Sequence, residues 1–153
     1  MTKSINYLIF LVFFGLFFAS CTKDEDGLVA PDIPEGIHFN FEGHSFSQTS
    51  LTKSYEAGNM YFQGREKTTK TEISFIVQDK MKVGKYNFAN IYNVTMNFLP
   101  FEQKEFVAKE GKFTLYELDK DQGTLKATFD CVFKNKNTGE IIYITDGRIN
   151  IEY

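Results

Sequence analysis

The sequence predicts an all-β domain in the form of an antiparallel β-sandwich with about eight to ten strands. Apolar and polar residues alternate with a period of two in segment after segment, and Gly, Asn and Asp separate these segments at nearly regular intervals. The 17 Phe and 8 Tyr residues favour half-buried strands, and no window shows a helical stripe of useful length. A lipocalin-like closed barrel is the alternative arrangement of the same strands.

Two segments precede this domain, which we place at residues 37–153. Residues 1–20 contain an apolar run that is too short to span a bilayer comfortably. The segment ends in two small residues directly before Cys21. This pattern predicts a lipoprotein signal peptide that is cut before Cys21, so that Cys21 carries the acyl chains that hold the protein on a bilayer. An uncleaved N-terminal anchor is the alternative. Residues 21–36 are polar and acidic and contain two prolines, which predicts a flexible tether.

The domain opens with a predicted hairpin. Residues 37–41 alternate between apolar and polar side chains, and residues 42–43, Glu-Gly, make a two-residue turn. Such a turn places Phe41 opposite His44, so that His44 lies on the apolar face while His38 points to the other face. The two histidines therefore cannot share a metal ion, and we expect no metal site.

The same alternation predicts further strands along the chain. They are expected at residues 60–63, 73–77, 85–88, 92–98, 106–108, 113–115, 125–133, 141–144 and 149–153. Glu110 with Gly111 predicts a turn between two of these strands, as do residues 137–139, and residues 146–147 separate the last two.

Two groups that could carry chemistry have a structural explanation. Cys131 is in phase with the apolar residues of its strand, so we place it in the core, and acylation of Cys21 would leave it without a disulfide partner. Asp119 and Asp121 are spaced like the start of a calcium loop but lack its other ligands, and with Gly123 they predict a turn. We expect no catalytic residue, no cofactor and no enzymatic activity.

The formal net charge is −3, and the negative excess lies in the tether. From residue 36 onward the chain carries 15 acidic and 15 basic residues. A balanced charge gives no basic field, so we expect no nucleic-acid partner.

Aromatic side chains supply a candidate ligand patch. Four of them fall at predicted strand ends or in loops: Tyr55, Tyr61, Tyr92 and Phe101. Rings with a polar group suit stacking on a sugar or packing in a protein interface. The alternative is that these residues cover the ends of the core.

Two resemblances bear on the location. Lys23, Asp24, Glu25 and Asp26 follow the predicted lipidated cysteine and resemble the lysine-plus-acidic signal of Bacteroidota lipoproteins, which marks export to the outer face of the outer membrane. A charged linker that only keeps a domain off the membrane is the alternative. The domain resembles an uncharacterised family of small β-rich Bacteroidota lipoproteins in FNFEGHSF at residues 39–46, in GKYNF at residues 84–88, and in residues 124–133 and 144–149. The resemblance implies a β-rich surface module and no active-site residues.

Together these patterns predict an outer-membrane lipoprotein that faces the cell exterior, with the periplasmic face as the alternative. We expect a binding or structural module that contacts the bilayer through its acyl anchor and a glycan or an envelope or host protein through its domain. A lipocalin-like carrier of a small apolar ligand is the second hypothesis, and an envelope hydrolase is the third. The ligand itself is not specified by the sequence.

Overall fold

The computed structural model describes residues 28–68, 70–91, 94–98 and 105–152. This part of the chain is almost entirely β, with one 3-10 helix of three residues, so the all-β prediction is confirmed. The elements are β1 (Gly36–Phe41), β2 (His44–Ser47), β3 (Ser50–Glu56), β4 (Asn59–Glu66), β5 (Thr71–Gln78), β6 (Gly84–Asn87), η1 (Phe88–Asn90), β7 (Thr95–Phe98), β8 (Glu105–Asp119), β9 (Thr124–Asn135) and β10 (Ile141–Glu152).

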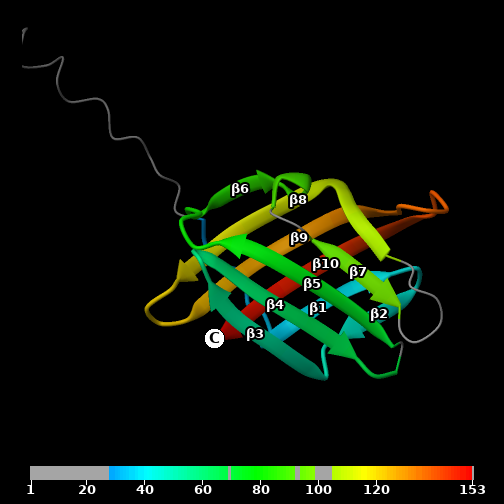
Figure 1. Cartoon of the computed structure of the whole chain (residues 1–153). Helices are drawn as coiled ribbons and strands as arrows, with labels where there is room; N and C mark the ends of the chain where they lie inside the picture. Colours follow the sequence, from blue (N-terminus) through cyan, green and yellow to red (C-terminus); the bar gives the residue numbers. More distant parts are fainter. Residues whose placement is uncertain (1–27, 69, 92–93, 99–104, 153) are drawn as a thin grey trace, which may run out of the picture.

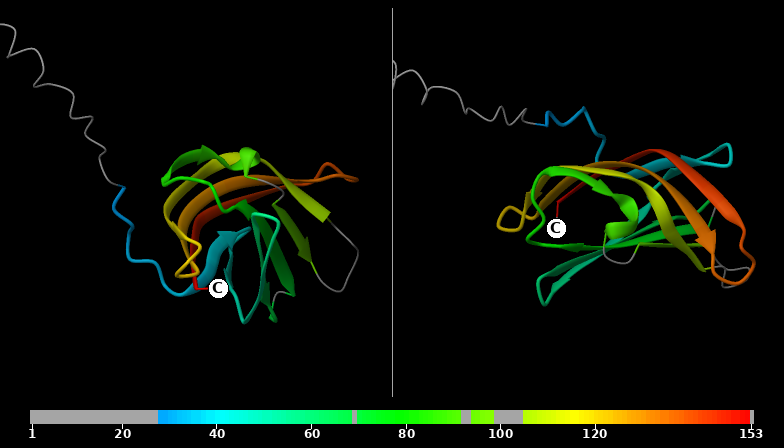
Figure 2. Two further views of the ribbon diagram at one scale, coloured as in Figure 1. Left: turned by 60° about the vertical axis from the view of Figure 1, so that its left-hand side comes forward. Right: turned by 90° about the horizontal axis from the view of Figure 1, so that it is seen from above.

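All ten strands belong to one antiparallel sheet in the order β2-β1-β10-β9-β8-β7-β5-β4-β3, and β6 pairs with β8 beside this path. The sheet curls, so that β3, β4, β5 and β7 form one layer in front of a second layer made by β8, β9, β10 and β1 (Figures 1 and 2). The two layers face each other as in the predicted sandwich. They differ from a sandwich because they are halves of one sheet, joined through the β7–β8 pair.

The curl also differs from the closed barrel that was the alternative, because β2 and β3 stand at the two ends of the strand order. These two strands are consecutive in the chain, and the corner between them touches both layers. There the N–H of Gln48 donates to the carbonyl of Ile37 at 3.1 Å, and the N–H of Thr49 donates to the carbonyl of Arg65 at 2.8 Å. The corner between β2 and β3 is thus hydrogen bonded to both β1 and β4, and it draws the two ends of the sheet together at this point.

The first hairpin has the predicted register. Phe41 pairs with His44 and Phe39 pairs with Phe46. Glu42 and Gly43 both have positive φ, 46° and 77°, as a two-residue turn of type I′ requires.

At two places where the sequence predicts a break between strands, the structure shows one continuous strand. Glu110 with Gly111 is no turn, since β8 runs through it as one strand, and β10 likewise runs through residues 146–147. Each place adjoins a β-bulge, because the register against β9 shifts between Ala108 and Glu110 and between Ile144 and Gly147. A Cβ on Gly111 would lie 2.2 Å from the Asp130 carbonyl oxygen, and one on Gly147 would lie 2.4 Å from the Phe129 oxygen. These glycines let the bulged strands approach β9, and each bulge bends its strand and so helps the sheet to curl.

A third difference concerns Phe88, which was expected to continue a strand. The strand β6 ends at Asn87, whose side-chain oxygen accepts the N–H of Ala89 at 3.0 Å and caps the 3-10 helix. This turn delivers Phe88 into the space between the layers, where it is fully buried.

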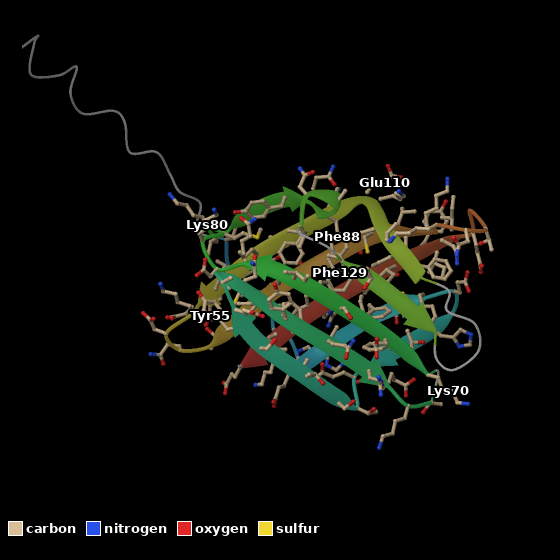
Figure 3. All side chains as sticks on the ribbon, viewed as in Figure 1. Tyr55, Lys70, Lys80, Phe88, Glu110 and Phe129 are labelled. Atoms are coloured by element: carbon tan, nitrogen blue, oxygen red, sulfur yellow. The ribbon has the colours of Figure 1, made fainter. Side chains whose placement is uncertain are left out.

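The core between the layers is filled by aromatic rings (Figure 3). The ring of Phe129 on β9 lies 5.3 Å from that of Phe88 and 5.6 Å from that of Phe75 on β5. Phe75 and Phe88 also contact each other edge to face, at 6.2 Å. Aromatic pairs at such distances add to the stabilisation from burial, so this trio links both layers to the 3-10 turn.

We predict that Gly111→Ala lowers the free energy of unfolding by at least about 2 kcal/mol, because the added Cβ meets backbone atoms at a position with φ of 143°. Gly84→Ala is the matched control. Its Cβ would have 3.6 Å to the nearest atom, so we expect a change below about 0.5 kcal/mol. Urea unfolding of the two variants measures both values, and equal stability would contradict the role given to the bulge.

Candidate functional site

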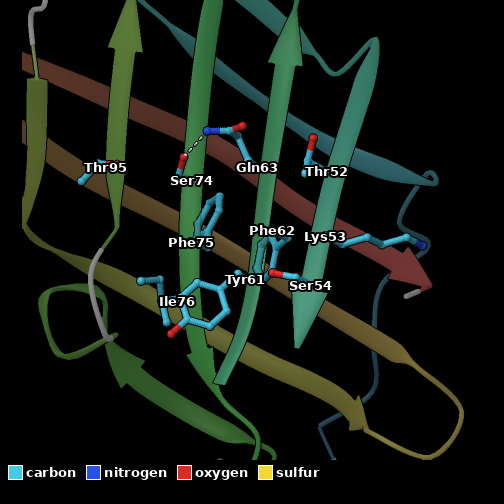
Figure 4. A pocket seen from close by; sticks show the side chains of 10 residues that line it. All are labelled: Thr52, Lys53, Ser54, Tyr61, Phe62, Gln63, Ser74, Phe75, Ile76 and Thr95. Carbon is cyan, nitrogen blue, oxygen red and sulfur yellow. Dashed lines mark hydrogen bonds between the residues drawn. The ribbon is translucent and has the colours of Figure 1, made fainter. Parts of the chain in front are cut away.

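The outer face of the front layer carries a shallow hollow of about 250 Å³ over β3, β4, β5 and β7 (Figure 4). Side chains alternate across a strand, so the inward neighbours of the hollow are core residues such as Phe62 and Phe75, and the outward ones line its floor. The floor consists of two parallel rows that run across the strands.

The first row is polar. Thr52 pairs with Gln63, Gln63 with Ser74, and Ser74 with Thr95, so one residue from each of four strands stands in line. The side-chain N–H of Gln63 donates to the hydroxyl of Ser74 at 3.2 Å. Neighbouring strands lie about 4.8 Å apart, so the row presents hydroxyl and amide groups at regular steps over about 14 Å.

The second row is more apolar and lies one step further along the strands. It consists of Ser54, Tyr61 and Ile76, which pair with one another across β3, β4 and β5. Tyr61 and Ile76 are half-buried, so part of each side chain is open to solvent. An aromatic ring and an aliphatic side chain thus stand next to the polar row.

The basic side chains near the hollow are hydrogen bonded to groups outside the two rows. Arg65, beyond the polar row, donates to Glu72 Oε2 from Nε at 3.2 Å and from Nη2 at 2.7 Å. Lys53 on β3 donates from Nζ to the carbonyl of Glu152 at the end of β10. In Figure 4 its side chain extends past the edge of β3, away from the two rows. The floor between these groups is therefore uncharged.

The structure places two of the four predicted patch residues. Tyr61 lies within β4 on the outer face, in the hollow. Tyr55 pairs with the buried Met60, so it points to the opposite side of the sheet, where it is 51% exposed and its hydroxyl donates to Asp79 at 2.5 Å. The two tyrosines therefore do not share a patch. Tyr92 and Phe101 lie outside the described residues.

The predicted anchor and export residues also lie outside the described residues. These are Cys21, Lys23, Asp24, Glu25 and Asp26. Close to them in the chain, Ile33 is buried against the domain, and its carbonyl accepts the side-chain N–H of Asn150 at 2.8 Å. The last part of the expected tether is thus held beside β10.

The two histidines lie on opposite faces of the first hairpin, as predicted. His38 is hydrogen bonded to the Glu35 carbonyl at 2.7 Å and to the Ser47 hydroxyl at 3.0 Å. The ring of His44 packs on Phe41, with 5.8 Å between the ring centroids. Within the described ranges, no group of three or more His, Cys, Asp or Glu side chains could hold a metal ion.

The spaced aspartates form the predicted turn. Asp119 Oδ1 accepts the N–H groups of Asp121 and Gln122 at 2.8 and 2.9 Å, and Gly123 has a φ of 69°. An aspartate that accepts the N–H two residues ahead mimics a backbone turn, so this carboxylate serves its own loop.

Two titratable groups differ from their ordinary behaviour in ways that oppose acid–base work. The hydrogen bond from Lys126, followed by that from Thr124, lowers the pKa of Glu117, so this carboxylate stays ionised at neutral pH. Burial raises the pKa of the Cys131 thiol, and the charge of Asp130 adds to the increase. Cys131 is 4% exposed among the core side chains, which confirms its predicted place in the core.

No known protein family, curated protein or solved structure matches this chain. In the part of the chain that the structure covers, no helix has the length and apolarity needed to cross a membrane. The function must therefore be argued from the geometry of the domain.

We predict that Cys131 does not react with a thiol reagent in the folded protein and reacts fully in urea. Its buried thiol keeps its proton up to pH 9, where an exposed cysteine is largely thiolate. The absorbance change with Ellman's reagent on the full-length protein in detergent measures the rate. Reaction of the folded protein at the rate measured in urea would contradict the burial of this group.

Because the folded state holds the proton of Cys131 more tightly than the unfolded state, the free energy of unfolding should fall as the pH rises above about 8.5.

Proposed function

We propose that this chain is an outer-membrane lipoprotein, anchored through acylated Cys21 and facing the cell exterior, whose β-domain binds a ligand. The observation that supports binding is the pair of rows on the outer face of β3, β4, β5 and β7. Hydroxyl and amide groups that can each donate and accept hydrogen bonds stand there beside a partly exposed aromatic ring. A few convergent polar groups next to an apolar surface are typical of ligand sites.

The interior gives less support to a carrier of apolar ligands. The crevice lined by Met60, Phe62, Leu125 and Ile151 has a volume of about 0 Å³ for a water-sized molecule. A ligand could enter this crevice only if the layers separated there. The outer hollow, by contrast, is open without any rearrangement.

The position of the anchor suits a domain held close to the membrane. Ile33 is docked beside β10, so residues 22–32 connect the predicted anchor to the domain. Fully stretched, these residues reach about 40 Å. The domain could then contact a polymer or a neighbouring protein at the cell surface while the acyl chains remain in the bilayer.

We predict that Cys21→Ala abolishes incorporation of an alkyne-labelled fatty acid and leaves the protein either uncleaved or released from the membrane, because this cysteine carries the acyl chains that supply the anchoring free energy. The other cysteine of the chain provides the control, since Cys131→Ser should keep the label. Fatty-acid labelling and fractionation measure both variants. Unchanged labelling of Cys21→Ala would refute the lipoprotein hypothesis.

We predict that a Thr52→Cys variant is labelled on intact cells by a membrane-impermeant maleimide. Thr52 is exposed on β3, whereas Cys131 is buried and Cys21 would be acylated. The chain without the substitution should therefore not be labelled, and it serves as the control.

Replacing Lys23, Asp24, Glu25 and Asp26 with alanines in the same variant should restrict labelling to lysed cells, because the expected export signal is gone. Labelling of intact cells by this quadruple variant would rule out these residues as the signal. A Thr52→Cys protein that is labelled only after lysis would place the domain in the periplasm.

A further inference from the structure

We propose that the two rows on the outer face form a binding site for an extended, neutral glycan chain. This inference rests on the proposed function and gives its ligand a chemical class. The polar row is Thr52, Gln63, Ser74 and Thr95, and the apolar row is Ser54, Tyr61 and Ile76.

The ligand should be uncharged and rich in hydroxyl groups. The row side chains bear no formal charge. Arg65 is paired with Glu72, and Lys53, which borders the hollow, extends past the edge of β3 to the Glu152 carbonyl (Figure 4). An anion or cation would give up water on this floor without gaining a counter-charge, which costs free energy. Hydroxyl and amide groups can donate to a sugar hydroxyl and accept from it, and so match such a ligand in either orientation.

The ligand should also have an apolar face. Tyr61 and Ile76 are adjacent across β4 and β5, and both are partly exposed beside the polar row. A pyranose ring has C–H groups on its faces and hydroxyls around its rim. Placed on Tyr61, it would stack its C–H face on the aromatic ring and direct its rim toward Gln63 and Ser74.

The geometry favours a chain over a single sugar. The polar row crosses four strands and spans about 14 Å, and its groups repeat with the strand spacing of about 4.8 Å. A ligand with a repeating pattern of hydroxyls can contact several of these steps at once. Because the hollow is open at its surface, a long polymer can cross it without its ends being threaded (Figure 4).

A peptide strand is less suited to this place. Peptides that add to a sheet bind at a free edge, where main-chain hydrogen bonds supply affinity. The hollow lies on the outer face of β3, β4, β5 and β7, and along the polar row β4 pairs with β3 and β5, while β5 pairs with β7 at Ser74. A peptide on this face would leave its own backbone groups to bond with side chains alone.

The test uses full-length protein in detergent on a printed array of neutral and acidic glycans. We expect binding to neutral glycans of several sugar units and none to acidic ones. For the neutral glycan bound, Tyr61→Ala should weaken binding at least tenfold, because the stacking surface is removed. Gln63→Ala should weaken it about fivefold through lost hydrogen bonds. Tyr61→Phe keeps the ring and should stay within about twofold.

Tyr143→Ala is the matched control. Tyr143 is 64% exposed on β10, in the other layer, so its loss should leave binding unchanged. Thermal unfolding of each variant checks that the domain is folded. If Tyr61→Ala does not fold, Gln63→Ala and Ser74→Ala decide the question, since both change only outward side chains.

The failure of this inference can be told apart from that of the proposed function. A photo-crosslinking residue at position 52 reports in intact cells on what covers the hollow. Crosslinks to a protein, without binding to any neutral glycan on the array, would overturn the glycan inference and keep the binding function. The absence of both crosslinks and glycan binding would overturn both. Equal losses for Tyr61→Ala and Tyr143→Ala would also overturn the proposed site.

Discussion

The structure depends on one constraint: a sheet without helices must cover its own apolar face. The strands alternate between apolar and polar side chains, so one face of the sheet is lined with Phe and Ile. No helix in the described chain could cover this face. The sheet therefore curls until β5 lies over β9, and the stacking of Phe75, Phe88 and Phe129 between them stabilises the closed form. This burial is the principal source of stability that a small all-β domain has.

The curl requires long strands that bend, and the bulges just before Gly111 and Gly147 supply bends on either side of β9. The same curl decides which surface is left for binding. The inner face is used for the core, whereas the outer face of the front layer stays open over four strands. Backbone pairing of β4 with β3 and β5, and of β5 with β7 at Ser74, holds the polar row in register.

Core and site are thus separated by the two faces of the same strands. Phe62 and Phe75 point inward, and their sequence neighbours Tyr61, Gln63 and Ser74 point outward. Substitutions of outward side chains therefore change little of the packing between the layers. From Gly36 onward the acidic and basic residues balance, and the acidic excess lies in the predicted tether.

Four features could be predicted from the amino-acid sequence: the all-β class, the register of the first hairpin, the turns after Asp119 and Asn135, and the buried position of Cys131. These features depend on neighbours within a few residues, because the side-chain period and the turn chemistry are local. That β8 continues through Gly111 beside a bulge, without a turn, emerges only in the folded domain, because it depends on how closely β9 approaches. Two other features likewise emerge only there: the halves belong to one sheet, and Thr52, Gln63, Ser74 and Thr95 stand in one row. Strand β3 could not be predicted, because its side chains are mostly exposed and its sequence shows no apolar alternation. A row across strands is set by the pairing of distant segments, and a single strand's pattern carries no information on its partner.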